Sequence, residues 1–247
     1  MEKNVHEMID YKRVAAVEGM EPAPAADRRA AKDSEATKSA ILTAATYEFS
    51  EFGVSGARID RIAARANANK SLIYSYFGDK EELYKIVLRS AYIQIRMGER
   101  ELDLSSYGPV EGVLRLVEFT FDHYNDNPWF LRLLAEENLR RGATVSQIGD
   151  IRQIQSQLTD TVSLMLEKGH RDGIFTREIS ATSLYLLIAS LFYFPMANRY
   201  TLSAVFGVEA DSPAWSAALL RQSQDIVLAY LCAPASSAAT DPATPEG

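Results

Sequence analysis

The chain has 247 residues, and its hydrophobic fraction of 47% supplies enough apolar material for one large domain or two modest ones. A single cysteine excludes an intramolecular disulfide and any metal cluster built on cysteine ligands, and it favours a reducing, cytoplasmic location. The formal net charge of -7 argues against a large basic surface for nucleic acid.

The negative charge is unevenly distributed along the chain. Residues 35–80 carry six basic and five acidic side chains, whereas the residues after 80 carry 14 basic and 21 acidic ones. A DNA-binding segment within residues 35–80 therefore has little net positive charge. Its affinity for DNA has to depend on where individual side chains point.

The first 34 residues are expected to form a flexible extension. They include most of the run EPAPAADRRAAKDSEA, in which two prolines interrupt helix formation and the apolar side chains are mostly alanine, too small to anchor a core. No basic segment followed by an apolar one opens the chain, so we do not expect a signal peptide. We also expect a disordered tail at residues 234–247.

A first helix is predicted from about Thr37 to Gly53. Apolar side chains recur there at spacings of four, four and three residues, as they do on one face of a helix. Glycine is common at the end of a helix, so we expect the helix to stop at Gly53. The apolar face consists of Ile41, Ala45, Phe49 and Phe52.

Two short helices joined by a tight turn follow, which is the frame of a helix-turn-helix at about Arg58 to Phe77. Asn69 is a good N-cap for the second of them, in which Ile73 and Phe77 face the core. The opposite face suits contacts to phosphates and base edges, because it carries Lys70, Ser71, Tyr74 and Ser75. The alternative is ordinary core packing, which is usual for an amphipathic helix rich in Tyr and Phe.

Residues 58–84, RIDRIAARANANKSLIYSYFGDKEELY, resemble the signature of the TetR/AcrR family of transcriptional regulators, and residues 41–57, ILTAATYEFSEFGVSGA, are similar too. The resemblance implies that DNA bases are contacted by Lys70, Ser71 and Ser75. It implies that the DNA backbone is contacted by Tyr74, Tyr76 and Lys80, with supporting DNA contacts from Thr37 and Arg58 on the other helices. The chain has Asn67 and Ala68 where the family commonly has Gly-Val, and asparagine tolerates the left-handed conformation. It also has Leu72 where a smaller or polar residue is frequent in the family. Leu72 either contacts the methyl group of a thymine or packs within the protein.

Residues 96–233 are predicted to be helical and, by the resemblance, to bind an effector and to dimerise. The segment Glu178–Phe206 is apolar nearly all round, which indicates burial on most sides, and Pro213–Cys232 carries a broad apolar stripe. The family pairs its last two long helices with their symmetry mates, so we assign both segments to a homodimer interface. Polar residues and a proline interrupt the uncharged stretch Ile179–Asn198, so we expect a buried helix and no membrane span.

Two further segments resemble a subset of the family, namely FDHYNDNPWFLRLLAEENLRRG at 121–142 and FPMANRYTLSAVFG at 194–207. Their resemblance implies a pocket between helices, where aromatic walls and a few polar groups suit a small molecule. Each candidate could equally belong to ordinary core packing or a satisfied polar contact. The candidate ligand-binding residues are His123, Trp129, Glu137, Asn138, Phe192 and Tyr193.

The sequence thus predicts an all-α protein with a three-helix helix-turn-helix DNA-binding domain at residues 35–95 and a helical ligand-binding and dimerisation domain at 96–233. We expect a cytoplasmic, homodimeric repressor, nucleoid-associated when it binds double-stranded DNA at a near-palindromic operator. A small-molecule effector of unknown identity is expected to release it. The alternative is a helical small-molecule-binding protein of the same fold without operator binding.

Catalysis is not expected. The three histidines lack the spacing of a zinc site, and the sequence contains no Walker loop, dinucleotide fingerprint or nucleophile elbow. We therefore predict no enzyme activity, no metal and no cofactor.

Overall fold

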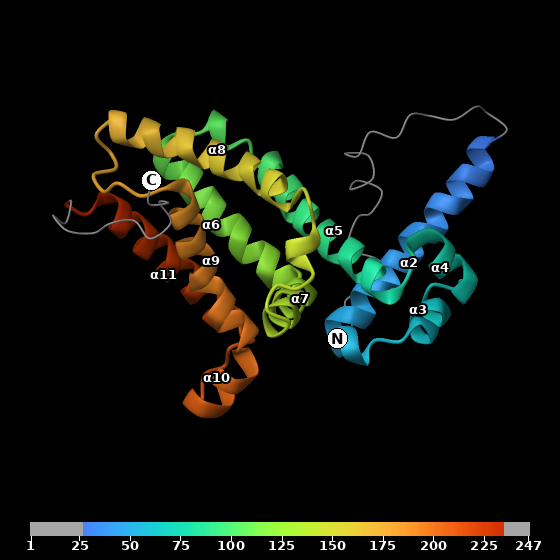
Figure 1. Ribbon diagram of the computed structural model, residues 1–247. Helices are drawn as coiled ribbons and strands as arrows, with labels where there is room; N and C mark the ends of the chain where they lie inside the picture. The colour runs from blue at the N-terminus through green and yellow to red at the C-terminus, as the bar shows by residue number, and fades with distance from the viewer. Residues whose placement is uncertain (1–26, 235–247) are drawn as a thin grey trace. The chain divides into compact units, whose positions relative to one another are not determined.

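The computed structural model describes the backbone of residues 27–234 and the side chains of residues 33–234. The expected extension as far as residue 26 and the expected tail from residue 235 lie outside the described residues. The described part is all helical, as the sequence predicted (Figure 1). Its elements are α2 (Asp27–Gly56), α3 (Ile59–Arg65), α4 (Lys70–Phe77), α5 (Lys80–Glu101), η2 (Leu104–Ser106), α6 (Pro109–Asp126), α7 (Pro128–Leu139), η3 (Val145–Gln147), α8 (Ile151–Arg171), α9 (Ala181–Ala197), α10 (Arg199–Phe206) and α11 (Pro213–Cys232).

The chain forms two compact units. The first contains the residues up to Ile95 and the segment Trp129–Ile151, and the second contains Arg96–Pro128 and the residues from Arg152 onward. The domain division predicted at residues 95 and 96 stays a prediction. The sequence did not indicate that α7 and η3 return to the first unit. Aromatic packing contributes to that return, because the rings of Tyr92 and Phe130 lie with their centroids 6.1 Å apart.

Helix α2 begins at Asp27, ten residues before the expected start at Thr37 and inside the segment expected to be flexible. The added residues are mainly alanine and charged residues, several of which are good helix formers. Ile41, Ala45 and Phe49 are buried, as predicted.

The prediction that Phe52 faces the core is wrong, because its side chain is 48% exposed. The chain bends at Gly53, where φ is 64°, and Phe52 lies just before this bend. Its ring instead packs beneath the guanidinium of Arg61, whose Cζ lies 4.3 Å from the ring centroid.

Gly53 is expected to be intolerant of a side chain. Its backbone is left-handed, and a Cβ there would lie 2.7 Å from Oε2 of Glu136, whose Oε1 accepts a hydrogen bond from the N–H of Val54 at 2.9 Å. We predict that Gly53→Ala lowers the free energy of unfolding, measured in urea, by about 1–3 kcal/mol. Gly207→Ala is the control, because Gly207 also has a positive φ but no atom within 4 Å of its added Cβ. Equal losses in the two variants would contradict the role of Glu136.

In the second unit, α6 packs against α9 and α11, which also pack against each other. The rings of Phe121 on α6 and Phe192 on α9 lie with their centroids 5.5 Å apart in the core. Helix α9 begins at the N-cap Ser180, whose Oγ accepts a hydrogen bond from the N–H of Ser183 at 3.1 Å.

The segment Glu178–Phe206 is not buried on most sides within this chain. It breaks at Asn198 into α9 and α10, and only one face of α9 is covered. On the uncovered face Leu186 is 56% and Phe194 is 61% exposed. Among the described residues no single helix is long and apolar enough to cross a membrane, and α9 and α10 meet that test only as a pair bent by 67°.

Candidate DNA interface and ligand site

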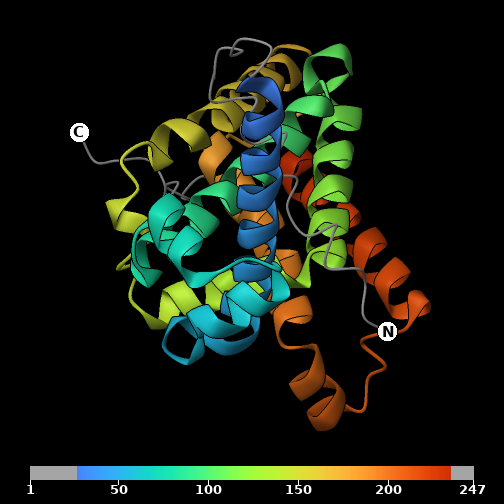
Figure 2. The same ribbon diagram turned by 90° about the vertical axis from the view of Figure 1, so that its right-hand side faces the viewer.

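Helices α3 and α4 form a helix-turn-helix beside α2, as Figure 2 shows. Asn67 adopts the left-handed conformation expected for the turn, with φ at 49°. Asn69 caps α4, because its Oδ1 accepts a hydrogen bond from the N–H of Leu72 at 2.8 Å. Ile73 and Phe77 are buried, as predicted, so they fix the rotation of α4 about its axis.

The opposite face of α4 is open to solvent. The side chain of Tyr74 on this face is 51% exposed. We call this surface of α4, which was predicted from the sequence to contact DNA, the reading face. All four predicted members, Lys70, Ser71, Tyr74 and Ser75, are exposed. The structure therefore brings together a cation, two hydroxyls and a phenol on one accessible helical surface.

A buried carboxylate ties α3 to α2. The side chain of Glu48 is 2% exposed, and its Oε1 accepts hydrogen bonds from the N–H of Arg58 at 2.8 Å and from Nε of Arg61 at 2.7 Å. Charged hydrogen bonds of this kind are stronger than neutral ones, so they hold the start of α3 in position. No pattern in the sequence indicated this contact of Arg61.

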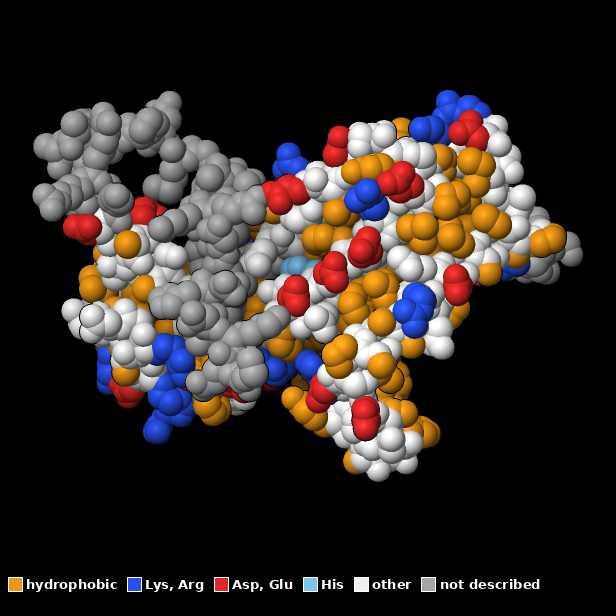
Figure 3. Space-filling model, turned by 180° about the vertical axis from the view of Figure 1, so that it is seen from behind, with side chains coloured by type: hydrophobic (Ala, Val, Ile, Leu, Met, Phe, Trp, Pro, Cys, Tyr) orange, Lys and Arg blue, Asp and Glu red, His pale blue; other side chains and the backbone are white. Residues whose placement is uncertain are grey.

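Several basic side chains of the helix-turn-helix are already engaged. Lys70 forms an ion pair with Asp60 of α3, and the Arg65 guanidinium lies 3.7 Å from the ring centroid of Tyr47. The side chain of Arg58 is exposed and pairs with no carboxylate among residues 33–234. Figure 3 shows Lys and Arg side chains gathered over the helix-turn-helix at its lower left, beside acidic ones. The partial neutralisation agrees with the small net charge of residues 35–80.

Three predicted DNA contacts lie elsewhere than on the reading face. Thr37 is not near the start of its helix, because α2 begins at Asp27, and its hydroxyl donates to the backbone oxygen of Asp33 at 2.8 Å. Tyr76 faces α2, where its hydroxyl accepts a hydrogen bond from Ser34 at 3.3 Å. These positions leave Tyr76 and Thr37 at the edge of the surface that α4 presents.

Lys80 is held by the backbone of the first unit. Its Nζ donates to the carbonyl oxygens of Val54 at 2.8 Å and Ala57 at 3.3 Å. These hydrogen bonds satisfy carbonyl groups just after the bend in α2. A phosphate contact by Lys80 would therefore use the remaining N–H of its ammonium group.

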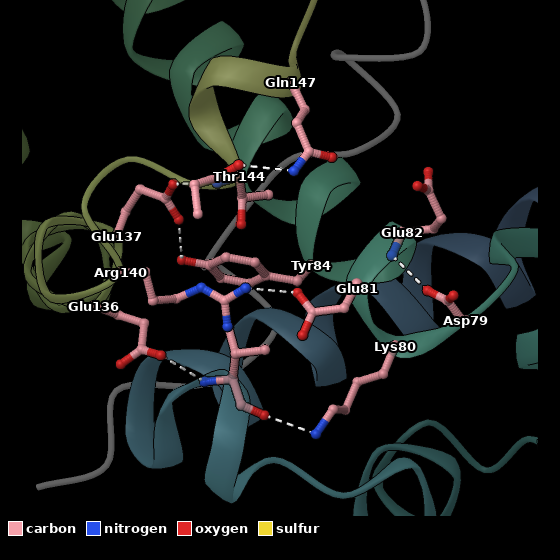
Figure 4. A network of polar contacts seen from close by, with 12 residues as sticks. Asp79, Lys80, Glu81, Glu82, Tyr84, Glu136, Glu137, Arg140, Thr144 and Gln147 are labelled. Carbon is pink, nitrogen blue, oxygen red and sulfur yellow. Dashed lines mark hydrogen bonds and ion pairs between the residues drawn. The ribbon is translucent and has the colours of Figure 1, made fainter.

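Glu137, a predicted ligand-binding residue, organises a loop of the first unit (Figure 4). Its Oε1 accepts hydrogen bonds from the N–H groups of Thr144 at 2.6 Å and Val145 at 2.8 Å, and its Oε2 accepts one from the hydroxyl of Tyr84 at 3.3 Å. Burial raises the pKa of Tyr84, so this phenol stays protonated and able to donate. The contacts of the Glu137 carboxylate are therefore structural.

The other predicted ligand-binding residues are distributed over both units. Trp129 is buried and Asn138 is exposed in the first unit, whereas His123, Phe192 and Tyr193 belong to the second. The ring of His123 stacks on Phe119 with centroids 5.8 Å apart, and burial lowers the pKa of His123 to about 4. None of the six candidates lines the cavity described next.

A cavity of about 380 Å³ lies within the second unit, between the end of α5, η2 and α8. Its volume is in the range of small-molecule sites. Leu104, Leu158 and Met165 give it apolar walls, and all three are buried. Three basic side chains, Arg96, Arg100 and Lys168, and two acidic ones, Glu99 and Asp103, also line it.

Arg96 and Glu99 form a buried pair at this cavity. Their side chains are 5% and 2% exposed, and Nη1 of Arg96 lies 2.9 Å from Oε2 of Glu99. Nη2 of Arg96 donates to the hydroxyl of Tyr185 at 2.7 Å. Burial raises the pKa of Glu99 to about 8, although Arg96 opposes this shift. This pair was not predicted, because no motif surrounds Arg96 and Glu99 in the sequence. Among the described residues, no three potential metal ligands come together.

Comparisons with known proteins agree with this geometry. The family described as "Bacterial regulatory proteins, tetR family" matches residues 41–87, and "Tetracyclin repressor-like, C-terminal domain" matches residues 109–227. The transcriptional repressor NicS of Pseudomonas putida is 36% identical over 185 residues, which cover 74% of this chain and 87% of NicS. The transcriptional repressor SCO4008 of Streptomyces coelicolor is 35% identical over 164 residues, which cover 66% and 79% of the two chains.

A solved structure shares the fold. The transcriptional regulator FadR of Bacillus subtilis, in complex with stearoyl-CoA, superimposes with a TM-score of 0.58 at 15% identity, covering 77% of this chain and 97% of that one. At this identity the likeness concerns the fold alone.

Proposed function

Because the chain belongs to the TetR family of bacterial transcriptional regulators, we propose that it acts as a homodimeric repressor that a small molecule releases from a near-palindromic operator. It is a DNA-binding protein of the helix-turn-helix type, and the family consists of regulators and not of enzymes. Its similarity to the repressors NicS and SCO4008 supports repression over activation.

The exposed face of α4 carries this proposal. Lys70, Ser71, Tyr74 and Ser75 lie on an accessible surface of a helix whose rotation is fixed by buried residues, as entry into a major groove requires. We assign base contacts to Lys70, Ser71 and Ser75 and backbone contacts to Tyr74 and Arg58. Thr37, Tyr76 and Lys80 are assigned to the edge of the interface, in keeping with their positions.

An apolar surface of the second unit supports dimerisation. Helices α9 and α11 pack together, and both leave large apolar side chains exposed, among them Leu186, Phe194 and Ile226. Exposed apolar side chains also occur on α10, the projection at the bottom of Figure 3. Burying such a surface against a second copy of the chain lowers the free energy. A symmetric dimer presents two copies of α4 to half-sites about 34–36 Å apart.

Release by a small molecule requires that the molecule bind the DNA-free arrangement more tightly than the DNA-bound one. A difference of about 1–3 kcal/mol is typical of allosteric coupling. The cavity of the second unit supports such binding, and the bound stearoyl-CoA of FadR is a precedent for a ligand in a protein of this fold.

A reporter assay tests the proposed function. An operator recovered by selection on the purified protein is placed between a promoter and a reporter gene, with the protein supplied from a second plasmid. We expect reporter expression to fall when the protein is present and to be unchanged with Lys70→Ala/Tyr74→Ala. Increased expression would overturn the assignment as a repressor, and failure to select any operator would favour a ligand-binding protein without DNA binding.

The salt dependence of DNA binding is expected to be shallow for a protein of this family. With Lys70 paired to Asp60 and Arg61 to Glu48, few cations are free to neutralise phosphates. The slope of log affinity against log salt is about -0.9 for each neutralised phosphate, so a gel-shift series over several salt concentrations counts these contacts. A slope equivalent to well over about ten phosphates per dimer would contradict the interface described above.

A further inference from the structure

Basic groups dominate the cavity of the second unit. Arg96, Arg100 and Lys168 contribute three positive charges, against the acidic side chains of Glu99 and Asp103. Asp103 is exposed and accepts a hydrogen bond from the hydroxyl of Ser105 at 2.8 Å. When Glu99 is protonated, the lining carries a net charge of +2, which attracts an anion.

The guanidinium of Arg96 has capacity for a further acceptor. One of its terminal nitrogens donates to Tyr185, but its Nε makes no hydrogen bond to any described residue, and neither oxygen of Glu99 accepts one. The planar donor fork of an arginine matches the two oxygens of a carboxylate. A buried arginine beside a cavity is therefore suited to hold a carboxylate that enters from outside.

Glu99 is the group around Arg96 that changes charge near neutral pH. Tyr124 on α6 and Tyr185 on α9 face the pair, and burial raises the pKa of both phenols, so they stay neutral. His123 on α6 faces Arg96, and its pKa of about 4 keeps it neutral as well. Arg100, Asp103 and Lys168 complete the charged groups of the lining.

The walls of the cavity favour a bound anion that also has an apolar part. Leu104, Leu158 and Met165 form an apolar surface, and a volume of about 380 Å³ is far larger than a phosphate ion needs. An apolar body in contact with these walls gains free energy as it leaves water. A free inorganic anion leaves these walls uncovered.

We propose that the cavity binds a small organic monocarboxylate, with its carboxylate on Arg96 and its apolar body against Leu104, Leu158 and Met165. This inference rests on the proposed function, because it names the chemical class of the effector. Where Glu99 is ionised, it takes up one proton from solution as the carboxylate enters and gives up its ion pair with Arg96. Apart from the O–H bond that this proton forms on Glu99, no covalent bond forms or breaks, and the net charge of the occupied site is unchanged.

Calorimetric titration of the purified protein without DNA tests the proposal. The probes are benzoate and hexanoate, with benzamide, hexanamide and inorganic phosphate as controls. We expect the carboxylates to bind at least about 10-fold more tightly than their amides, because a charged hydrogen bond to Arg96 is lost. Titrations in two buffers of different ionisation enthalpy are expected to show uptake of about half a proton at pH 8 and of nearly one proton at pH 9, since carboxylate binding competes with ionised Glu99.

The pH dependence has a defined direction. Affinity for benzoate is expected to fall by about 10-fold between pH 7 and pH 9, as Glu99 ionises and holds Arg96. Glu99→Gln, which keeps the shape of the protonated side chain, is expected to bind benzoate without pH dependence and without proton uptake. Lys168→Gln is expected to weaken carboxylate binding, whereas Arg171→Gln, at an exposed position of α8 outside the cavity, is the charge-matched control.

Failure of both carboxylates to bind at millimolar concentration would overturn the proposal. Equal binding of the amides, phosphate binding as tight as benzoate, or pH-independent binding by the unchanged protein would do so as well. Because DNA is absent, these results are separate from the operator selection that tests the proposed function.

Discussion

Replacing Glu137 with alanine is expected to lower the free energy of unfolding by about 3–6 kcal/mol, a loss large enough to unfold a protein of ordinary stability. Three donors lose their acceptor at once, namely the N–H groups of Thr144 and Val145 and the hydroxyl of Tyr84. Thr144 and Tyr84 are buried, so water does not readily replace the carboxylate. Urea denaturation followed by circular dichroism measures the loss.

Two variants serve as controls for this prediction. Asn138→Ala changes the next residue, which is exposed and donates only to the carbonyl oxygen of Leu134 in its own helix, so a change below about 0.5 kcal/mol is expected. Glu137→Gln keeps an oxygen for the two N–H groups and is expected to lose about 1–2 kcal/mol. If Glu137→Ala proves as stable as Asn138→Ala, the structural role of this carboxylate is wrong.

Glu137 also shows where reasoning from sequence stops. Its place beside Asn138 in a family-like segment suggested a ligand contact, but its carboxylate caps a loop seven residues farther along the chain. Such a cap depends on the path of that loop, which no local pattern encodes. The Arg96–Glu99 pair is a second example, because its cavity is closed by Leu158 and Met165, which are distant in sequence.

The helix-turn-helix was predictable because its signals are local. The cap at Asn69, the left-handed turn at Asn67 and the spacing of Ile73 and Phe77 all act within a few residues, and the structure confirms each of them. The prediction for Phe52 was wrong because helical spacing does not reveal that its ring is exposed and packs against Arg61.

Substitutions on the reading face of α4 are expected to have a large effect on operator binding. We predict that Lys70→Ala/Tyr74→Ala weakens operator binding by about 100- to 1,000-fold, because a dimer loses two contacts on each half-site at about 1 kcal/mol apiece. Both side chains are exposed, so the fold and the dimer are expected to persist. Fluorescence anisotropy with a labelled operator measures the affinity.

The control for this variant is Arg152→Ala, which removes one exposed charge from α8 in the second unit. It is expected to bind the operator within about 2-fold of the unchanged protein, since Arg152 does not belong to the helix-turn-helix. Size-exclusion chromatography and thermal denaturation verify that both variants remain folded and in the same oligomeric state.

Selection of random DNA fragments tests most directly whether α4 reads an operator. The unchanged protein is expected to enrich fragments that share an inverted repeat, with half-site centres about 10 base pairs apart or a multiple of that spacing. The Lys70→Ala/Tyr74→Ala protein is expected to enrich none. Fragments without a shared repeat, or the same fragments retained by the double variant, would contradict the assignment of α4 as the recognition helix.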